Sequence, residues 1–72
     1  MALSEEEKER RLKYFELVGS IHARTIYALK QAGATDESIA ASELDILKRA
    51  NQQAGDMLGY SYYPYTRNTG DN

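Results

Sequence analysis

The chain has 72 residues, 28% of them charged, and its 9 Lys+Arg and 11 Asp+Glu give a formal net charge of −2. This length allows one small domain, and the near-balanced charge excludes a global, non-specific attraction to nucleic acid or to an anionic membrane. The chain has no cysteine and a single histidine, His22, which excludes disulfides, thiolate metal sites and histidine-rich metal clusters.

Neither a secretory signal nor a membrane-spanning segment is expected. The N-terminal residues mix acidic and basic side chains without an apolar region, and no apolar stretch reaches the roughly 18 residues of a membrane span. The lack of cysteine also fits a reducing compartment. We therefore expect a cytoplasmic protein.

The first predicted element is a long helix over residues 5 to 32. Ser4 is followed three residues later by Glu7, a capping box in which the Ser hydroxyl accepts the Glu7 amide and the Glu carboxylate returns to the cap amide. Gly33 comes shortly after Lys30, and a glycine behind a cation is typical of a helix C-terminus. Both ends of the helix are thus marked by local signals.

The second predicted element is a helix over residues 36 to 58. Thr35 is a hydroxyl N-cap followed by two acids, Asp36 and Glu37, where the helix dipole favours negative charge. Gly59 is the expected C-terminal glycine. Because the connection of residues 33 to 35 is so short, residues 1 to 59 should form an antiparallel helical hairpin, followed by an extended Tyr-rich tail over residues 60 to 72.

The apolar side chains of both predicted helices cover wide arcs. The first arc contains Tyr14, Phe15, Leu17, Val18, Ile21, Ile26, Ala28, Leu29 and Ala32; the second contains Ile39, Ala40, Leu44, Ile46, Leu47, Ala50, Ala54, Met57 and Leu58. One facing helix cannot cover an arc of roughly 180°. We therefore predict an all-α fold in which two hairpins form a four-helix homodimer.

Two glycines, Gly19 and Gly55, interrupt these helices, each at a cost of about 0.5–1 kcal/mol relative to alanine. Close approach of a neighbouring helix would account for them. A hinge or a notch that faces a ligand is the alternative.

His22 and Glu43 are the most informative polar pair. Both fall within the apolar arcs, and antiparallel pairing sets them at nearly the same level of the hairpin, beside Thr25. A buried polar group needs a partner, so we expect a core hydrogen bond that fixes the register or the dimer geometry. A general acid/base dyad and a pH-sensitive switch are the alternatives. A metal site is not expected, because one imidazole without a Glu-x-x-His pair is too few ligands.

Aromatic residues gather after the second helix. Residues 59 to 67 hold four of the six tyrosines and the only proline, and the candidate partner-binding residues of this segment are Tyr60, Tyr62, Tyr63, Tyr65 and Arg67. They can fold back as a clasp, within one chain or exchanged across a dimer, on Arg10 and Arg11 near the start of the chain, which are candidate partner-binding residues as well. Recognition of another protein and base stacking on a nucleotide are the alternatives.

No sequence feature indicates catalysis. A phosphate-binding loop and a nucleophile elbow are both missing, and neither an enzyme nor a cofactor is expected. We predict a small protein-interaction module that regulates or inhibits a macromolecular target, of a size typical of accessory proteins of phages and other mobile elements. Its expected partners are a second copy of itself and a host protein. The alternative is an oligomeric helical-hairpin sponge that holds a nucleotide between Tyr and Arg side chains.

Overall fold

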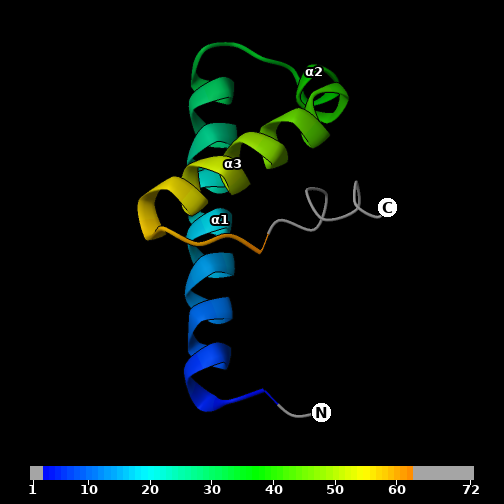
Figure 1. The fold of residues 1–72 in the computed structure, drawn as a ribbon. Helices are drawn as coiled ribbons and strands as arrows, with labels where there is room; N and C mark the ends of the chain where they lie inside the picture. The colour runs from blue at the N-terminus through cyan, green and yellow to red at the C-terminus, as the bar shows by residue number, and fades with distance from the viewer. Residues whose placement is uncertain (1–2, 63–72) are drawn as a thin grey trace, which may run out of the picture.

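The computed structural model describes residues 3–62, and this part of the chain is all-helical (Figure 1). It contains α1 (Glu5–Gln31), α2 (Asp36–Ala41) and α3 (Glu43–Leu58), with no strand among the described residues. The predicted all-α class is confirmed. No helix in the described range is long and apolar enough to cross a membrane.

The ends of α1 follow from its caps. The Ser4 hydroxyl accepts a hydrogen bond from the Glu7 amide at 3.0 Å, as the cap predicts. The predicted return bond from the cap amide of Ser4 to the Glu7 carboxylate is wrong, because this carboxylate binds Arg11 and Tyr62 instead. At the other end the Ala32 amide bonds to the Ala28 carbonyl, and Gly33 takes a positive φ of 97° that favours glycine.

The second predicted helix is divided into two at Ser42. Thr35 does cap α2, accepting from the Ser38 amide at 3.1 Å. At Ser42 (φ −104°, ψ 7°) the helix stops, and the Ser42 amide bonds to the Ile39 carbonyl three residues back. The Ser42 carbonyl then accepts from Ile46, which starts α3. Serine is a poor helix former, and the break changes the chain direction so that α3 crosses α1 obliquely (Figure 1).

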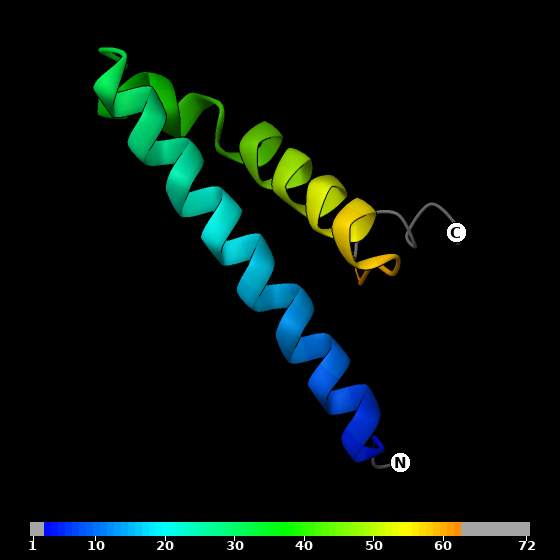
Figure 2. The same ribbon diagram turned by 90° about the vertical axis from the view of Figure 1, so that its left-hand side faces the viewer.

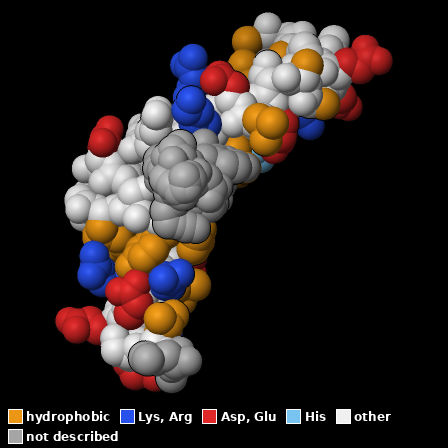
Figure 3. All heavy atoms as spheres, turned by 45° about the vertical axis from the view of Figure 1, so that its right-hand side comes forward, with side chains coloured by type: hydrophobic (Ala, Val, Ile, Leu, Met, Phe, Trp, Pro, Cys, Tyr) orange, Lys and Arg blue, Asp and Glu red, His pale blue; other side chains and the backbone are white. Residues whose placement is uncertain are grey.

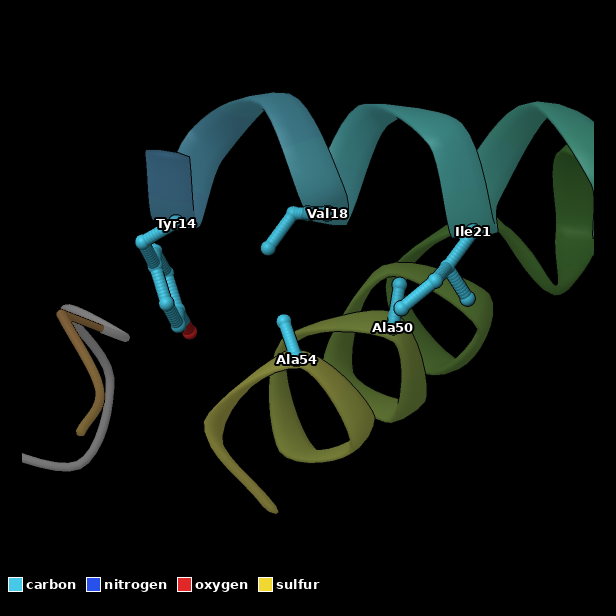
Figure 4. Packing of buried hydrophobic residues seen from close by; sticks show 5 residues of the cluster. All are labelled: Tyr14, Val18, Ile21, Ala50 and Ala54. Atoms are coloured by element: carbon cyan, nitrogen blue, oxygen red, sulfur yellow. The ribbon is translucent and has the colours of Figure 1, made fainter. Parts of the chain in front are cut away.

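The core lies where α3 crosses the middle of α1 (Figure 4). Its buried members are Tyr14, Val18 and Ile21 from α1 with Ala50 and Ala54 from α3. Two alanines opposite larger side chains let the helix axes approach closely, because neither alanine extends beyond its Cβ. The core is consequently narrow.

Tyr14 anchors this core with a hydrogen bond as well as its ring. The side chain is 0% exposed, and its hydroxyl donates to Oδ1 of Asn51 at 2.6 Å. Asn51 is 5% exposed and donates from Nδ2 to the Leu47 carbonyl at 2.9 Å. A buried polar group with both partners supplied fixes the register of the two helices without an unsatisfied atom.

α1 is much longer than the helix that packs on it. Its 27 residues span about 40 Å, against about 24 Å for the 16 residues of α3. Figure 2 shows the N-terminal part of α1, in blue, running on beyond the end of α3. That part of α1 is where the residues after Gly59 arrive.

Candidate protein-interaction site

The first turns of α1 present charged side chains in helical register. Arg10 and Arg11 each lie three or four residues from both Glu7 and Tyr14, so the four side chains share one side of the helix. Arg11 Nε lies 3.2 Å from the Glu7 carboxylate and Arg10 lies 3.9 Å from it. We call these four residues the charged row of α1. Its last member, Tyr14, belongs to the buried core.

Gly59 returns the chain to this row. Its φ of 83° is left-handed, and its amide bonds to the Gly55 carbonyl at 2.8 Å, which is the predicted glycine stop of the helix. The following residues cross in front of α1 in the view of Figure 1. Gly55 makes room for this crossing, because a Cβ there would lie 3.2 Å from the Ser61 Cβ.

Two arginines cover two tyrosine rings at the crossing. The Arg10 guanidinium carbon lies 4.3 Å from the centroid of the Tyr60 ring, and that of Arg11 lies 4.8 Å from the Tyr62 ring. The Tyr62 hydroxyl donates to the Glu7 carboxylate at 2.6 Å. Each arginine therefore makes a cation–π contact, and Glu7 bridges one of them to the tyrosine that it covers.

The rings also contact one another. Tyr62 packs edge-on to Tyr14 with 5.6 Å between centroids and edge-on to Tyr60 at 5.8 Å, and Phe15 lies 5.2 Å from Tyr14. These are favourable aromatic geometries. We call the whole group the aromatic–arginine cluster; it consists of Glu7, Arg10, Arg11, Tyr14, Phe15, Tyr60 and Tyr62.

The Tyr62–Glu7 hydrogen bond sets the protonation of both partners. It lowers the pKa of Glu7, against a desolvation that raises it, and the nearby Arg10 and Arg11 lower it further. The same bond raises the pKa of Tyr62, with desolvation acting in the same direction. Glu7 is a carboxylate and Tyr62 a neutral donor at neutral pH, and the bond extends the pH range of both states, for Glu7 toward acid and for Tyr62 toward alkali.

His22 and Glu43 meet, but not inside the core. Nε2 of His22 lies 2.8 Å from the Glu43 carboxylate, with 27% and 46% of the two side chains exposed. The expectation that both are buried is wrong, because the break at Ser42 makes Glu43 the first residue of α3, at the edge of the helix pair. Thr25 bonds to the Ile21 carbonyl at 2.8 Å rather than to this pair. The contact is a half-exposed bond between α1 and α3.

Some predicted site residues are brought together and others fall outside the described range. Tyr60 and Tyr62 lie against Arg10 and Arg11, whereas Tyr63, Tyr65 and Arg67 lie outside the described residues. Their roles in partner binding stay predictions. Among the described residues no group of three His, Cys, Asp or Glu side chains could hold a metal ion.

Sequence reasoning missed two residues of this region. Glu7 was interpreted as a capping residue among acids at ion-pair spacing to the arginines, and its bond to Tyr62 was not expected. Asn51 was not singled out, although it lies four residues after Leu47 and three before Ala54, within the second apolar arc. A polar residue inside an apolar arc is a signal for a buried hydrogen bond.

Comparison with protein families, with curated proteins and with solved structures gives no match to this chain.

Proposed function

We propose that this protein is a non-enzymatic interaction module, an antiparallel helical hairpin that docks on a macromolecular target as a small regulator or inhibitor. The observation that carries the proposal is the aromatic–arginine cluster. Tyrosine and arginine are the residue types that contribute most to binding at protein interfaces, and here they are gathered at one end of a rigid helix.

The cluster offers a partner ordered groups that are still accessible. The side chains of Arg10 and Arg11 are 47% and 45% exposed, and Phe15 is 49% exposed. Their contacts with Tyr60 and Tyr62 hold them in place before a partner arrives. Pre-ordered side chains lose less conformational entropy on binding, which favours affinity.

We propose in addition that the module acts as a homodimer of hairpins. Apolar side chains remain at the surface after α3 has packed on α1: Leu12 is 60% exposed, Leu44 72% and Met57 62%. A chain of this length rarely draws more than about 3–5 kcal/mol from its own core, and a second copy is a common additional source of stability.

The nucleotide sponge has less support. A base would have to stack on Tyr60 or Tyr62, but Arg10 and Arg11 already lie over a face of each ring. A bound base would have to displace a guanidinium or use the opposite face. The hydrogen bonds of Tyr62 and Glu7 are likewise already made within the chain.

Affinity capture from a lysate of the source organism tests this function. The full-length protein is compared with Arg10→Glu and with Arg49→Glu, a matched control in which the arginine of α3 that pairs with Asp45 at i,i+4 spacing is reversed. We expect a protein that is enriched by the wild type and by Arg49→Glu and is lost with Arg10→Glu. A co-purified nucleotide in native mass spectrometry, or equal capture by all three proteins, would contradict the proposal.

A further inference from the structure

A second face of α1 carries apolar side chains that α3 does not cover. Leu12, Phe15 and Gly19 are spaced at intervals of three and four, with Lys8 and Ala23 one turn beyond at either end, so they form one line along the helix. We call this line the seam. Leu12 and Phe15 are 60% and 49% exposed, and Figure 3 shows hydrophobic side chains at the surface in the lower half of the molecule.

No contact within the described chain explains why a glycine occupies position 19, in the middle of the seam. A Cβ added at Gly19 would meet no atom within 4 Å, yet a glycine inside a helix costs about 0.5–1 kcal/mol relative to alanine. The other described glycines have reasons: Gly33 and Gly59 have positive φ, and Gly55 lies against Ser61. An open glycine between exposed apolar residues fits the close approach of a helix that is not part of this chain.

We propose that the seam binds the seam of a second copy, with the two α1 helices antiparallel and crossing near Phe15. The proposal rests on the proposed function, in which the module works as a dimer, and it names the surface that joins the two copies. A two-fold axis beside Phe15 sets Leu12 of each copy on Gly19 of the other. The larger side chain then fills the space that the glycine leaves open.

The symmetry of the seam favours a second copy over an unrelated protein. Leu12 and Gly19 lie at equal distances on either side of the axis, and so do Lys8 and Ala23. In an antiparallel pair, Leu12 therefore faces Gly19 of the other copy, and Lys8 faces Ala23. Bulky residues of one half therefore oppose small residues of the other half. A surface that complements itself in this way is what an isologous dimer requires.

Charge favours an antiparallel over a parallel arrangement of the two α1 helices. The first two turns of α1 contain Glu5, Glu6, Glu7 and Glu9. A parallel pair would set these glutamates beside the same residues of the other copy, and Lys8 beside Lys8, where like charges repel. An antiparallel pair moves the two acidic ends apart. The helix dipoles also favour this direction.

The self-association surface shares Phe15 with the aromatic–arginine cluster and otherwise lies beside it. Tyr60 and Tyr62 meet α1 through Arg10, Arg11 and Tyr14, which point to a different side of the helix from Leu12 and Gly19 at 100° per residue. Phe15 stands at the border of the two. A dimer built on the seam would cover Phe15 and present the remaining residues of two clusters to a target.

Engineered cysteines test the geometry directly, because the natural chain has none. We would mix full-length Lys8→Cys and Ala23→Cys proteins in equal amounts, oxidise them, and weigh the disulfide dimers by intact mass spectrometry. The mixed Lys8→Cys/Ala23→Cys species should dominate over both homodimers. Ser20→Cys, an exposed control lying off the seam on the same helix, should cross-link poorly. A dominant Lys8→Cys homodimer, or Ser20→Cys cross-linking as efficient as the mixed pair, would overturn the proposal.

Sedimentation of the protein without cross-linking is the second test, and it measures the dissociation constant of the dimer. Leu12→Glu should raise the dimer dissociation constant at least about tenfold, since the charge would be buried against Gly19 of the other copy. Tyr27→Glu, a 67% exposed control on another side of α1, should change it less than about twofold. A wild type that stays monomeric at micromolar concentration overturns the proposal, and so do equal effects of the two variants. Target capture by the wild type is scored separately, so that failure of the seam and failure of target binding are told apart.

Discussion

The middle of α1 and its N-terminal turns are held in different ways. Its middle packs on α3 through a fully buried Tyr14, two alanines and a buried asparagine, which depend on the exclusion of water. Its N-terminal turns are held by the aromatic–arginine cluster, where half-exposed arginines, a carboxylate and tyrosine rings depend on charge. The difference teaches that apolar burial and charge hold different parts of one short chain. The second region should respond to salt and pH, and the first should not.

Removing the Tyr14 side chain should have the largest effect on stability. Tyr14→Ala deletes a fully buried ring, at a cost of about 3–5 kcal/mol, which is as large as the whole stability expected of such a small core. We expect the variant to be largely unfolded at 25 °C by circular dichroism. Tyr14→Phe should cost about 1–3 kcal/mol, because Asn51 loses its partner. Native melting of Tyr14→Ala would show that this core does not hold the fold.

Removing the Tyr62 ring should have a smaller effect that depends on salt. Tyr62→Ala loses contacts with Tyr14 and Arg11 and the bond to Glu7, for which we expect a loss of about 1–2 kcal/mol in the free energy of unfolding. In urea titrations the loss should shrink as sodium chloride is raised from 50 mM to 1 M. The effect of Tyr14→Phe should stay constant over the same range. A salt-independent Tyr62→Ala effect would contradict the contrast between the two regions.

The two helix glycines should respond differently to alanine. At Gly19 the added methyl group meets nothing within the described chain, so Gly19→Ala should stabilise the dissociated chain by about 0.5–1 kcal/mol. At Gly55 the methyl group would press on Ser61 at 3.2 Å, which should cancel or reverse that gain. Thermal melts at low protein concentration measure both variants. Equal stabilisation would show that Ser61 does not pack against α3 in solution.

The Tyr62–Glu7 bond gives the smallest predicted effect, a dependence on pH. The pKa of Glu7 is lowered from its ordinary 4.5, so its contribution is present above pH 4.5 and is lost as the pH falls through the lowered value. The pKa of Tyr62 is raised from 10.0, so its contribution is present below pH 10 and is lost as the pH rises through the raised value. The stability difference between wild type and Glu7→Gln should be largest between these limits. A difference that is unchanged in acid would contradict this assignment.

Local signals in the sequence were enough for the helix ends but not for their arrangement. Ser4, Thr35, Gly33 and Gly59 act as predicted, because caps and left-handed glycines depend only on neighbouring residues. The break at Ser42 was missed because no glycine or proline marks it.

The candidate site shows the same limit. Antiparallel counting brought His22 level with Glu43, but their exposure depends on the break and could not be counted. The bond from Tyr62 to Glu7 joins residues 55 positions apart. Which residue Tyr62 binds therefore depends on the tertiary fold and not on local sequence. The sequence was sufficient to predict which residues share a face of one helix. It was not sufficient to predict the contacts that residues after Gly59 make with α1.

Amide hydrogen exchange of the protein bound to its captured target tests the central claim most directly. If the aromatic–arginine cluster is the docking surface, binding should slow exchange in the first three turns of α1 and over residues 59–62, and should leave α2 unchanged. Protection confined to α2 and the start of α3, or no protection at either end of the molecule, would contradict the claim.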